Sequence, residues 1–332
     1  MKNTALAICL FLAACGAKPN RPHVRIATVA TGLQTQQMPI TLAYTLGYYK
    51  DEGLDVTMVN LSSNTKTLQS LIGGSVDVAG TAYQQTIQMA AEGQRVRAFF
   101  IGVRRNSNVL IVAPAAAQKV RRIEDLKGAV VGIPSPGSPT HQWASYILAA
   151  HGVQPADYSA VGIGVAASAV AAVESGRIDA AGLSGGDHFH LLRRNPGLRI
   201  LVDASTPEGM REGYGPVFAS GAMVAKQEWL DRNPDAARRL ARALQRSLQW
   251  IAAHTPEEIR ARLPDELRSP DAAVDLDVIR WSLPSFTPDG RMPAGAPEAM
   301  KRFMDATMDK VRNAEIDLAA TWTNEYLPGG TK

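Results

Sequence analysis

Cysteine, clustered basic residues and long apolar runs are all scarce in this chain of 332 residues. The two cysteines, Cys9 and Cys15, lie near the start, so the rest of the chain has no disulfide and no thiol chemistry. Basic and acidic residues number 35 and 31, and no basic cluster is dense enough to favour nucleic acid as a partner. The remaining composition, 45% hydrophobic and 20% charged, is typical of a globular protein with two domains or one large one.

The first residues resemble the leader of a bacterial lipoprotein. Lys2 supplies a positive charge, and the apolar segment from Ala5 to Leu12 is too short to cross a bilayer as a permanent helix. The sequence Leu-Ala-Ala-Cys, which ends at Cys15, then has the small residues and the cysteine of a lipobox. We therefore expect residues 1–14 to be a removed signal peptide and Cys15 to be acylated, with palmitate among the acyl chains.

This leader implies a location outside the cytoplasm. Residues 15–23, with two prolines, are expected to form a tether between the acyl anchor on the membrane and the folded protein. Gly16 follows the cysteine, and glycine rather than aspartate at this place resembles lipoproteins that are sorted to the outer membrane. The expected location is the periplasm, with the anchor in the outer membrane rather than the inner one. An ordinary secretory leader with an incidental cysteine is the alternative.

Strand-like and helix-like segments alternate from residue 24 onward. Short apolar runs, such as 24–30, precede segments with apolar residues three or four apart, such as 39–50. This order predicts a mostly parallel sheet with helices on both faces. The pattern occurs twice, over roughly 24–113 and 114–218, and a long amphipathic helix is expected from about 233 to 254.

The stretch GIPSPGSPTHQW, residues 132–143, joins a predicted strand to a predicted helix. Ser138 is a suitable N-cap, and the proline after it suits the first helical position. The backbone N–H groups of Thr140, His141 and Gln142 should then lie unpaired at the positive end of the helix, where a carboxylate, sulfonate or phosphate could bind. The stretch matches neither the phosphate-binding P-loop nor the glycine pattern of a dinucleotide turn.

Three other strand-to-helix junctions contain small residues, hydroxyls, amides or an aromatic ring. They are Thr31–Gln37, Gly80–Tyr83 and Ser184–His188. Ligands of open parallel sheets bind at the carboxyl ends of the strands. The four junctions together are therefore the expected ligand site.

The candidate catalytic and metal-binding residues are explained more simply by structural roles. Ser138 and His141 are one helical turn apart, but no acid is placed to orient the imidazole, so a cap and a polar neighbour are favoured over a catalytic dyad. Asp187, His188 and His190 suggest a metal site, yet residues two apart on a helix point to different faces. We expect no catalytic residue, no metal and no cofactor.

Several segments, spread across roughly residues 24–255, match motifs of a known family in the family's order. The main ones are Met38–Ala43, Leu46–Val56, Leu71–Ala79, Ile123–Gly128, Val173–Ala180 and Trp229–Asp235, with Gly137, Ser138 and His141 between them. Together they resemble solute-binding proteins of ABC importers for nitrate, sulfonates and taurine, a superfamily that includes the fungal thiamine-pyrimidine synthase. The cysteine-rich motif of the fungal enzyme is absent.

The resemblance implies an α/β fold of the periplasmic-binding-protein type II class, with two α/β lobes of mixed sheets joined by two crossing strands. The first lobe is expected from residues 24–112 plus 219–332, and the second from 113–218. The implied function is a monomeric receptor that captures a small polar organic or anionic solute and delivers it to a membrane permease and its ATPase. An enzyme on the same fold, acting on a pyrimidine or another metabolite, and a ligand sensor for a membrane partner are the alternatives.

The resemblance also implies which residues contact the ligand. They are Gln36, Thr81, Tyr83, Ser138, Thr140 and His141, with Gly185 and Asp187 as further candidates. An aspartate facing the cleft would favour a cationic or hydrogen-bond-donating ligand, whereas nitrate and sulfonates are anions. The charge of the solute therefore stays open at the level of sequence.

Overall fold

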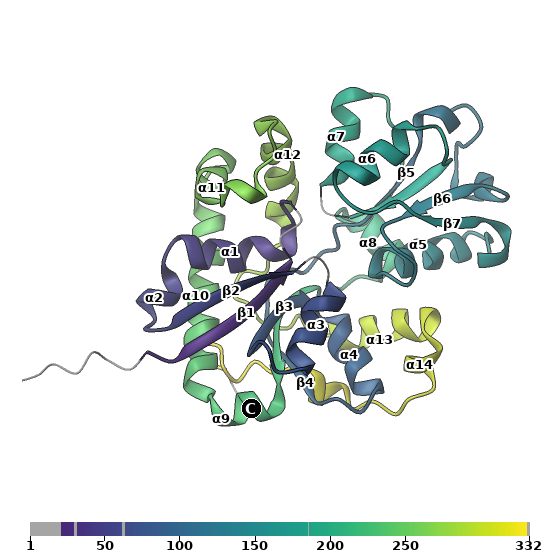
Figure 1. The fold of residues 1–332 in the computed structure, drawn as a ribbon. Helices are drawn as coiled ribbons and strands as arrows, with labels where there is room; N and C mark the ends of the chain where they lie inside the picture. Colours follow the sequence, from purple (N-terminus) through teal and green to yellow (C-terminus); the bar gives the residue numbers. More distant parts are fainter. Residues whose placement is uncertain (1–20, 30–31, 62–63, 185, 331–332) are drawn as a thin grey trace, which may run out of the picture.

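The protein folds into two α/β lobes, each built on a five-stranded sheet, in a computed structural model that describes residues 21–29, 32–61, 64–184 and 186–330 (Figure 1). Residues 1–20, and with them the leader and Cys15, lie outside the described residues. Both sheets are mixed, because each contains one strand antiparallel to its neighbours. The expected class of fold is confirmed.

The first sheet has the strand order β2-β1-β3-β10-β4, with β10 antiparallel to β3 and β4. Its strands are β1 (His23–Val29), β2 (Asp55–Leu61), β3 (Val78–Ala82), β4 (Val96–Ile101) and β10 (Gly221–Lys226). Side chains alternate between its faces as the strand period requires. In β1, Ile26 belongs to the apolar cluster that contains Leu42 and Leu240, whereas Ala27 belongs to the cluster that contains Leu68 and Ile87.

The second sheet has the order β7-β6-β8-β5-β9, with β5 antiparallel to β8 and β9. Its strands are β5 (Val109–Val112), β6 (Val130–Ile133), β7 (Ser159–Gly162), β8 (Ala180–Leu183) and β9 (Ile200–Asp203). The lobe boundary expected at 112/113 is therefore wrong by one strand. β5 is assigned to the first lobe by the sequence pattern, but its four residues are fully buried and hydrogen-bonded in the second sheet.

Helices cover both faces of each sheet. In the first lobe they are α1 (Met38–Thr45), α2 (Tyr48–Asp51), α3 (Asn64–Ile72), α4 (Gln84–Ala91), α9 (Gln227–Arg232), α10 (Pro234–Ala253), α11 (Pro256–Arg262), α12 (Ala272–Ser282), α13 (Ala296–Thr307) and α14 (Asp309–Arg312). In the second lobe they are α5 (Pro139–Ala150), α6 (Ala167–Glu174), α7 (Asp187–Arg194) and α8 (Pro207–Gly213).

Two of the helices test the sequence pattern directly. The helix expected over 39–50 is interrupted, because Gly47 adopts a left-handed φ of 78° between α1 and α2. The long helix is confirmed as α10, which buries the expected apolar stripe, Leu240, Leu244 and Leu248 among it, against the first sheet. None of the helices in the described part of the chain combines the length and apolar character that crossing a bilayer requires.

Two segments connect the lobes within the described residues. One follows β4 and covers 102–108, and the other follows α8 and covers 214–220. We call the part built on the first sheet, up to 101 and from 221, the first lobe, and 109–213 the second lobe. After the second crossing the chain sends α12 toward α7 and α13 toward α5, so that C-terminal helices of the first lobe flank the second lobe on two sides (Figure 1).

Candidate functional site

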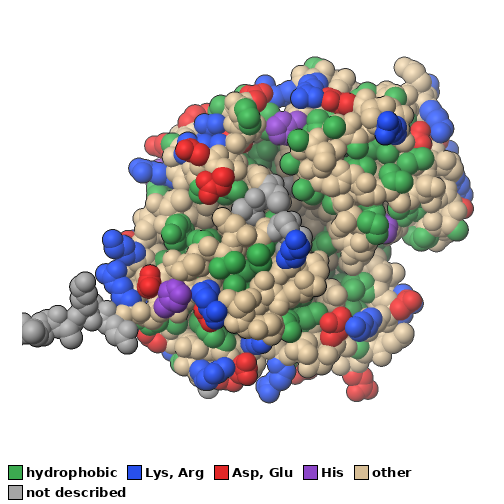
Figure 2. Space-filling model, in the orientation of Figure 1, with side chains coloured by type: hydrophobic (Ala, Val, Ile, Leu, Met, Phe, Trp, Pro, Cys, Tyr) green, Lys and Arg blue, Asp and Glu red, His purple; other side chains and the backbone are tan. Residues whose placement is uncertain are grey.

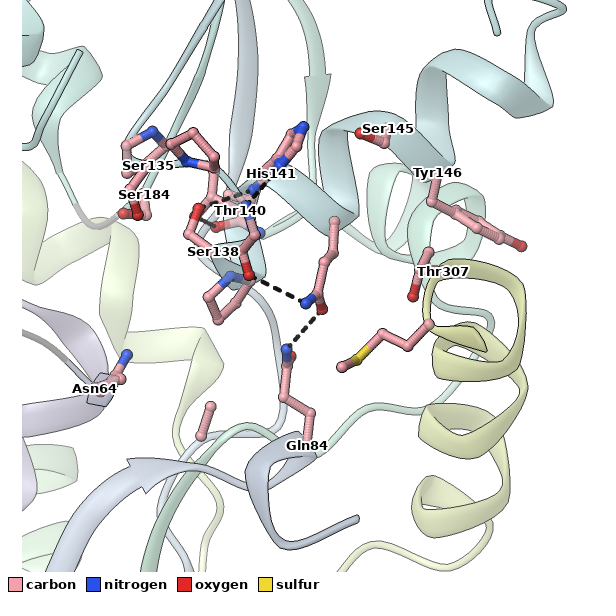
Figure 3. Close-up of a pocket in the computed structure, with 18 of the residues that line it drawn as sticks. Asn64, Gln84, Ser135, Ser138, Thr140, His141, Ser145, Tyr146, Ser184 and Thr307 are labelled. Carbon is pink, nitrogen blue, oxygen red and sulfur yellow. Dashed lines mark hydrogen bonds between the residues drawn. The ribbon is translucent and has the colours of Figure 1, made fainter. Parts of the chain in front are cut away.

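A cavity of about 1510 Å³ lies between the lobes, at the carboxyl ends of their parallel strands. The first lobe contributes the segment after β1 and the starts of α3 and α4, and the second contributes the loop from β6 to α5. Figure 3 shows polar side chains from these elements pointing toward the same space, with the last turn of α13 on one side. Figure 2 shows charged side chains spread over both lobes and a hollow where the lobes meet.

The start of α5 forms as the sequence predicts, but its backbone donors are less available than expected. Ser138 is the N-cap, and its Oγ accepts from the backbone N–H of His141 at 3.2 Å. The N–H of Gln142 donates to the carbonyl of Ser138 at 3.0 Å. Of the three N–H groups expected to be unpaired, only that of Thr140 has no partner among the described residues, so the expectation of a row of free donors is wrong.

The ring of His141 is held in one orientation and one tautomer. Its Nδ1 accepts from the backbone N–H of Gly137 at 2.9 Å, which leaves the proton on Nε2. Partial burial lowers the pKa of the imidazole, so the ring is neutral at pH 7. Because the ring does not contact the hydroxyl of Ser138, the pair lacks the geometry of a nucleophile and its base.

A hydrogen-bonded pair of amides bridges the cavity. Gln84, at the start of α4 in the first lobe, donates from Nε2 to Oε1 of Gln142 on α5 at 3.4 Å (Figure 3). Gln142 in turn donates from Nε2 to the carbonyl of Gly137 at 3.2 Å. A direct contact between the lobes therefore lies inside the cavity, beside the α5 N-terminus.

A second polar network connects the cavity to both crossing segments. The hydroxyl of Tyr214 accepts from Nδ2 of Asn106 at 2.8 Å and from Nδ2 of Asn108 at 3.3 Å. Oδ1 of Asn108 accepts from the hydroxyl of Thr140 at 3.2 Å. Burial raises the pKa of Tyr214 well above its usual value, so the phenol stays neutral. The position of α5 is thus coupled through buried hydrogen bonds to the segments about which the lobes would rotate.

Four of the expected ligand residues line this cavity: Gln36, Ser138, Thr140 and His141. Thr81 does not line the cavity. It is fully buried, and its hydroxyl donates to Oε1 of Gln85, which does line the cavity.

Tyr83, by contrast, does not line the cavity. Its ring is fully buried in the core, and its hydroxyl is 2.7 Å from that of Thr321. Tyr83 follows β3 as the N-cap residue of α4, and from this place its side chain turns to the core rather than to the cavity.

Of the two remaining candidates, the structure describes only Asp187, which lines a second cavity. Gly185 lies outside the described residues, and Asp187 lines a smaller cavity of about 640 Å³ on the α7 and α12 side. The Asp187 carboxylate accepts from the backbone N–H of Ala166 at 3.0 Å, and burial raises its pKa. Ala166 has a φ of 53°, a strained value for a residue with a Cβ, so this aspartate stabilises a loop instead of facing the main cavity.

Several lining residues were missed by the sequence analysis. Gln84 directly follows a junction that was singled out, and the Asn106-Ser-Asn108 segment was not among the expected ligand residues. In the sequence, the amide side chains that follow the strands were the signal that could have identified these lining residues. Met308 and Lys310 come from far along the chain, and no motif marks them.

The histidines next to Asp187 point in different directions, as the helical spacing predicts. His188 is buried, with ring-centroid distances of 4.1 Å to Phe189 and 5.0 Å to Trp281 of the first lobe, whereas His190 lines the second cavity. Burial lowers the pKa of His188 to about 4, and its Nδ1 has no partner among the described residues. This side chain is therefore part of an apolar contact between the lobes.

The chain belongs to the NMT1/THI5-like family, whose model matches residues 34–259. A solved structure of a protein from Bordetella bronchiseptica RB50 is 32% identical, with a TM-score of 0.82 over 92% of this chain and 96% of that one. The periplasmic aliphatic sulphonate binding protein SsuA of Escherichia coli is 20% identical, with a TM-score of 0.71 over 92% and 99%. YtlA of Bacillus subtilis (strain 168), a provisionally assigned binding protein, is 24% identical over 312 residues, 89% of this chain and 86% of its own length. These likenesses confirm the periplasmic-binding-protein fold.

The polar network around the hydroxyl of Tyr214 gives a first testable prediction. The substitution Tyr214→Phe removes the shared acceptor and leaves two buried amide donors unpaired, so the free energy of unfolding should fall by about 1–3 kcal/mol. Urea unfolding measures this change. Tyr44→Phe, at a ring that is 49% exposed, is the control and should change stability by no more than about 0.5 kcal/mol. Equal stabilities for the two variants would contradict the role of the network.

The buried histidine gives a second prediction, about pH. Since folding lowers the pKa of His188 from the ordinary 6.5 of histidine to about 4, the stability due to the neutral ring is fully present above pH 6.5 and is lost as the pH falls toward 4. The nearby carboxylate of Asp203 opposes part of this shift. Between pH 7 and 4.5, wild type should lose about 2–3 kcal/mol more unfolding free energy than His188→Gln. The exposed His23, changed to Gln, is the control. Parallel pH profiles for wild type and His188→Gln would refute the prediction.

Proposed function

We propose that this protein is an extracytoplasmic receptor that captures a small solute between its two lobes and delivers it to the permease of an ABC importer. The observation that supports this most is the cavity itself, which takes its walls from both lobes while two segments of the chain connect them. Such a cavity changes shape whenever the lobes rotate about the crossing segments. The family and the relatives named as binding proteins favour the same function.

Capture and closure would be one event in this proposal. A solute that touches both lobes stabilises the closed arrangement only to the extent that its contacts are better there than in the open one. The amide pair Gln84 and Gln142 already spans the space between the lobes, so a bound solute would compete with or extend this bridge. Thr140 would transmit the displacement of α5 to Asn108 and thus to the hinge.

The surroundings of the receptor also belong to the proposal. We place it in the periplasm as a monomer, with Cys15 acylated and inserted in the outer membrane rather than the inner one. The partners would be the permease and its ATPase. No catalytic step is part of this function. Ser138 and His141, which line the cavity, are arranged as a helix cap and a backbone acceptor.

Binding is tested by a thermal-shift screen of polar solutes, followed by small-angle X-ray scattering with each hit. A solute at about a hundred times its dissociation constant should add roughly 2.7 kcal/mol to the unfolding free energy. The same solute should reduce the radius of gyration, because the lobes close. Gln142→Ala should weaken binding at least tenfold, whereas Gln69→Ala, on the exposed side of α3, should not. A hit that is chemically converted during incubation, with conversion lost in His141→Ala, would favour an enzyme instead.

The lipid anchor is tested separately in growing cells. Cys15→Ser should abolish incorporation of labelled palmitate into the protein, because the acyl chains need that thiol. Cys9→Ser is the matched control, since it changes the other cysteine of the chain, and it should keep the label. Labelling that persists in Cys15→Ser would refute the anchor and leave the binding function unaffected.

A further inference from the structure

The lining of the main cavity is almost free of charge. Of the described residues that form it, only Asp309 and Lys310 have charged side chains, apart from the neutral His141. Both charged residues lie on α14 and already have partners on the surface: Asp309 pairs with Arg312 at 2.9 Å and Lys310 with Glu92 at 2.8 Å. They form part of the rim and not a charged interior.

Other cations near the cavity do not supply the missing charge. Arg104 and Arg105 precede Asn106 in the first crossing segment, and Lys66 is exposed on α3, but none of the three lines the cavity. The positions that separate the described ranges, 30, 31, 62, 63 and 185, are alanine, threonine, two serines and glycine in the sequence. Apart from Lys310 at the rim, which is paired with Glu92, a buried anion would therefore meet no cationic side chain among the described residues of this lining.

The helix N-terminus at the cavity does not substitute for a cation. A helix binds anions through unpaired N–H groups in its first turn. In α5 the hydroxyl of Ser138 occupies the N–H of His141, and the carbonyl of Ser138 occupies that of Gln142. The helix dipole remains, but most of the N–H groups that would bind an anion are already hydrogen-bonded within the protein.

What the cavity does offer is side-chain amides from both lobes. Gln36, Gln84, Gln85 and Gln88 come from the first lobe, and Gln142 comes from the second. Each amide presents two N–H donors and one carbonyl acceptor side by side. An anion such as a sulfonate has acceptors only, so it would use the amide N–H donors and offer no donor to the amide carbonyls.

We infer that the cavity selects an uncharged solute that both donates and accepts hydrogen bonds, of the amide, imide or lactam class, over carboxylates, sulfonates and nitrate. This inference rests on the proposed receptor function. Its physical basis is the cost of burying an ion without a counter-charge, which is several kcal/mol, whereas a neutral amide is fully compensated by complementary amides.

The inference is tested by isothermal titration calorimetry at pH 7, in a buffer that is not itself a sulfonate. The probes are pairs that differ mainly in charge: benzamide with benzoate, benzenesulfonamide with benzenesulfonate, and succinimide with succinate. Nitrate and taurine are titrated as well. The neutral member of each pair that binds should bind at least tenfold more tightly than its anion.

A matched pair of variants tests whether the uncharged lining causes this preference. Gln88→Lys places a cation at a half-buried lining position of α4, and it should lower the ratio of neutral to anionic affinity at least tenfold. Gln69→Lys adds the same charge on the exposed face of α3, outside the cavity, and should leave the ratio unchanged.

The outcomes distinguish failure of the neutral-solute inference from failure of the proposed receptor function. Equal or tighter binding of the anions by wild type would overturn the neutral-solute inference and leave the receptor function standing. An unchanged ratio in Gln88→Lys would also overturn it, because the lining charge would then not set the preference. If none of the neutral or anionic probes bound, and the broader screen gave no solute that closes the lobes, the receptor function and this inference would both fail.

Discussion

The hydroxyl of Tyr214 holds the two crossing segments of this protein together, and the arrangement of the lobes depends on that contact. Asn106 and Asn108 donate to it from the first segment, and Tyr214 itself begins the second. Thr140, at the first turn of α5, adds the cavity to the same network through Asn108. Because all four side chains are buried, a group that lost its partner and was left unsatisfied would cost about 1–3 kcal/mol. The hinge and the cavity are therefore parts of one polar network.

Contacts at two outer sides of the second lobe complement this central network. On one side Trp281 of α12 lies against His188 and Phe189, and on the other Phe303 of α13 packs against Tyr146, with ring centroids 5.3 Å apart. These are apolar and non-directional contacts, which tolerate small rotations better than hydrogen bonds do. A receptor that closes about its hinge needs such surfaces, because the lobes must slide as they approach. The C-terminal helices α12 and α13 thus belong to the first lobe and also contact the second.

The nearly uncharged cavity lies in a fold that this chain shares with a sulphonate binding protein. The strands and helices of the two lobes match those of a sulphonate binding protein over nearly the whole chain, with a TM-score of 0.71. Identity with that protein is only 20%, and ligand chemistry resides in the loops at the strand ends. In this chain those loops supply amides, hydroxyls and one neutral imidazole. The likeness of fold is therefore compatible with a solute of a different charge.

The sequence by itself implied the class of fold only through its resemblance to a known family. It determined directly the alternation of strands and helices, the buried stripe of α10 and the cap at Ser138. Each of these depends on local periodicity or on the chemistry of a short segment, which a single sequence displays directly. The sequence also indicated the loop from β6 to α5 as a ligand site, and Ser138, Thr140 and His141 do line the cavity.

Only the tertiary structure decided which of the other candidates reach that cavity. Strand ends are recognisable in sequence, but the direction of a side chain depends on its packing partners. Tyr83 turns to Thr321, which lies 238 positions further along the chain, and Asp187 turns to the strained loop at Ala166. The amide bridge between Gln84 and Gln142 likewise joins two lobes whose relative position no local pattern specifies. Long-range packing therefore determined which of the candidate residues line the cavity.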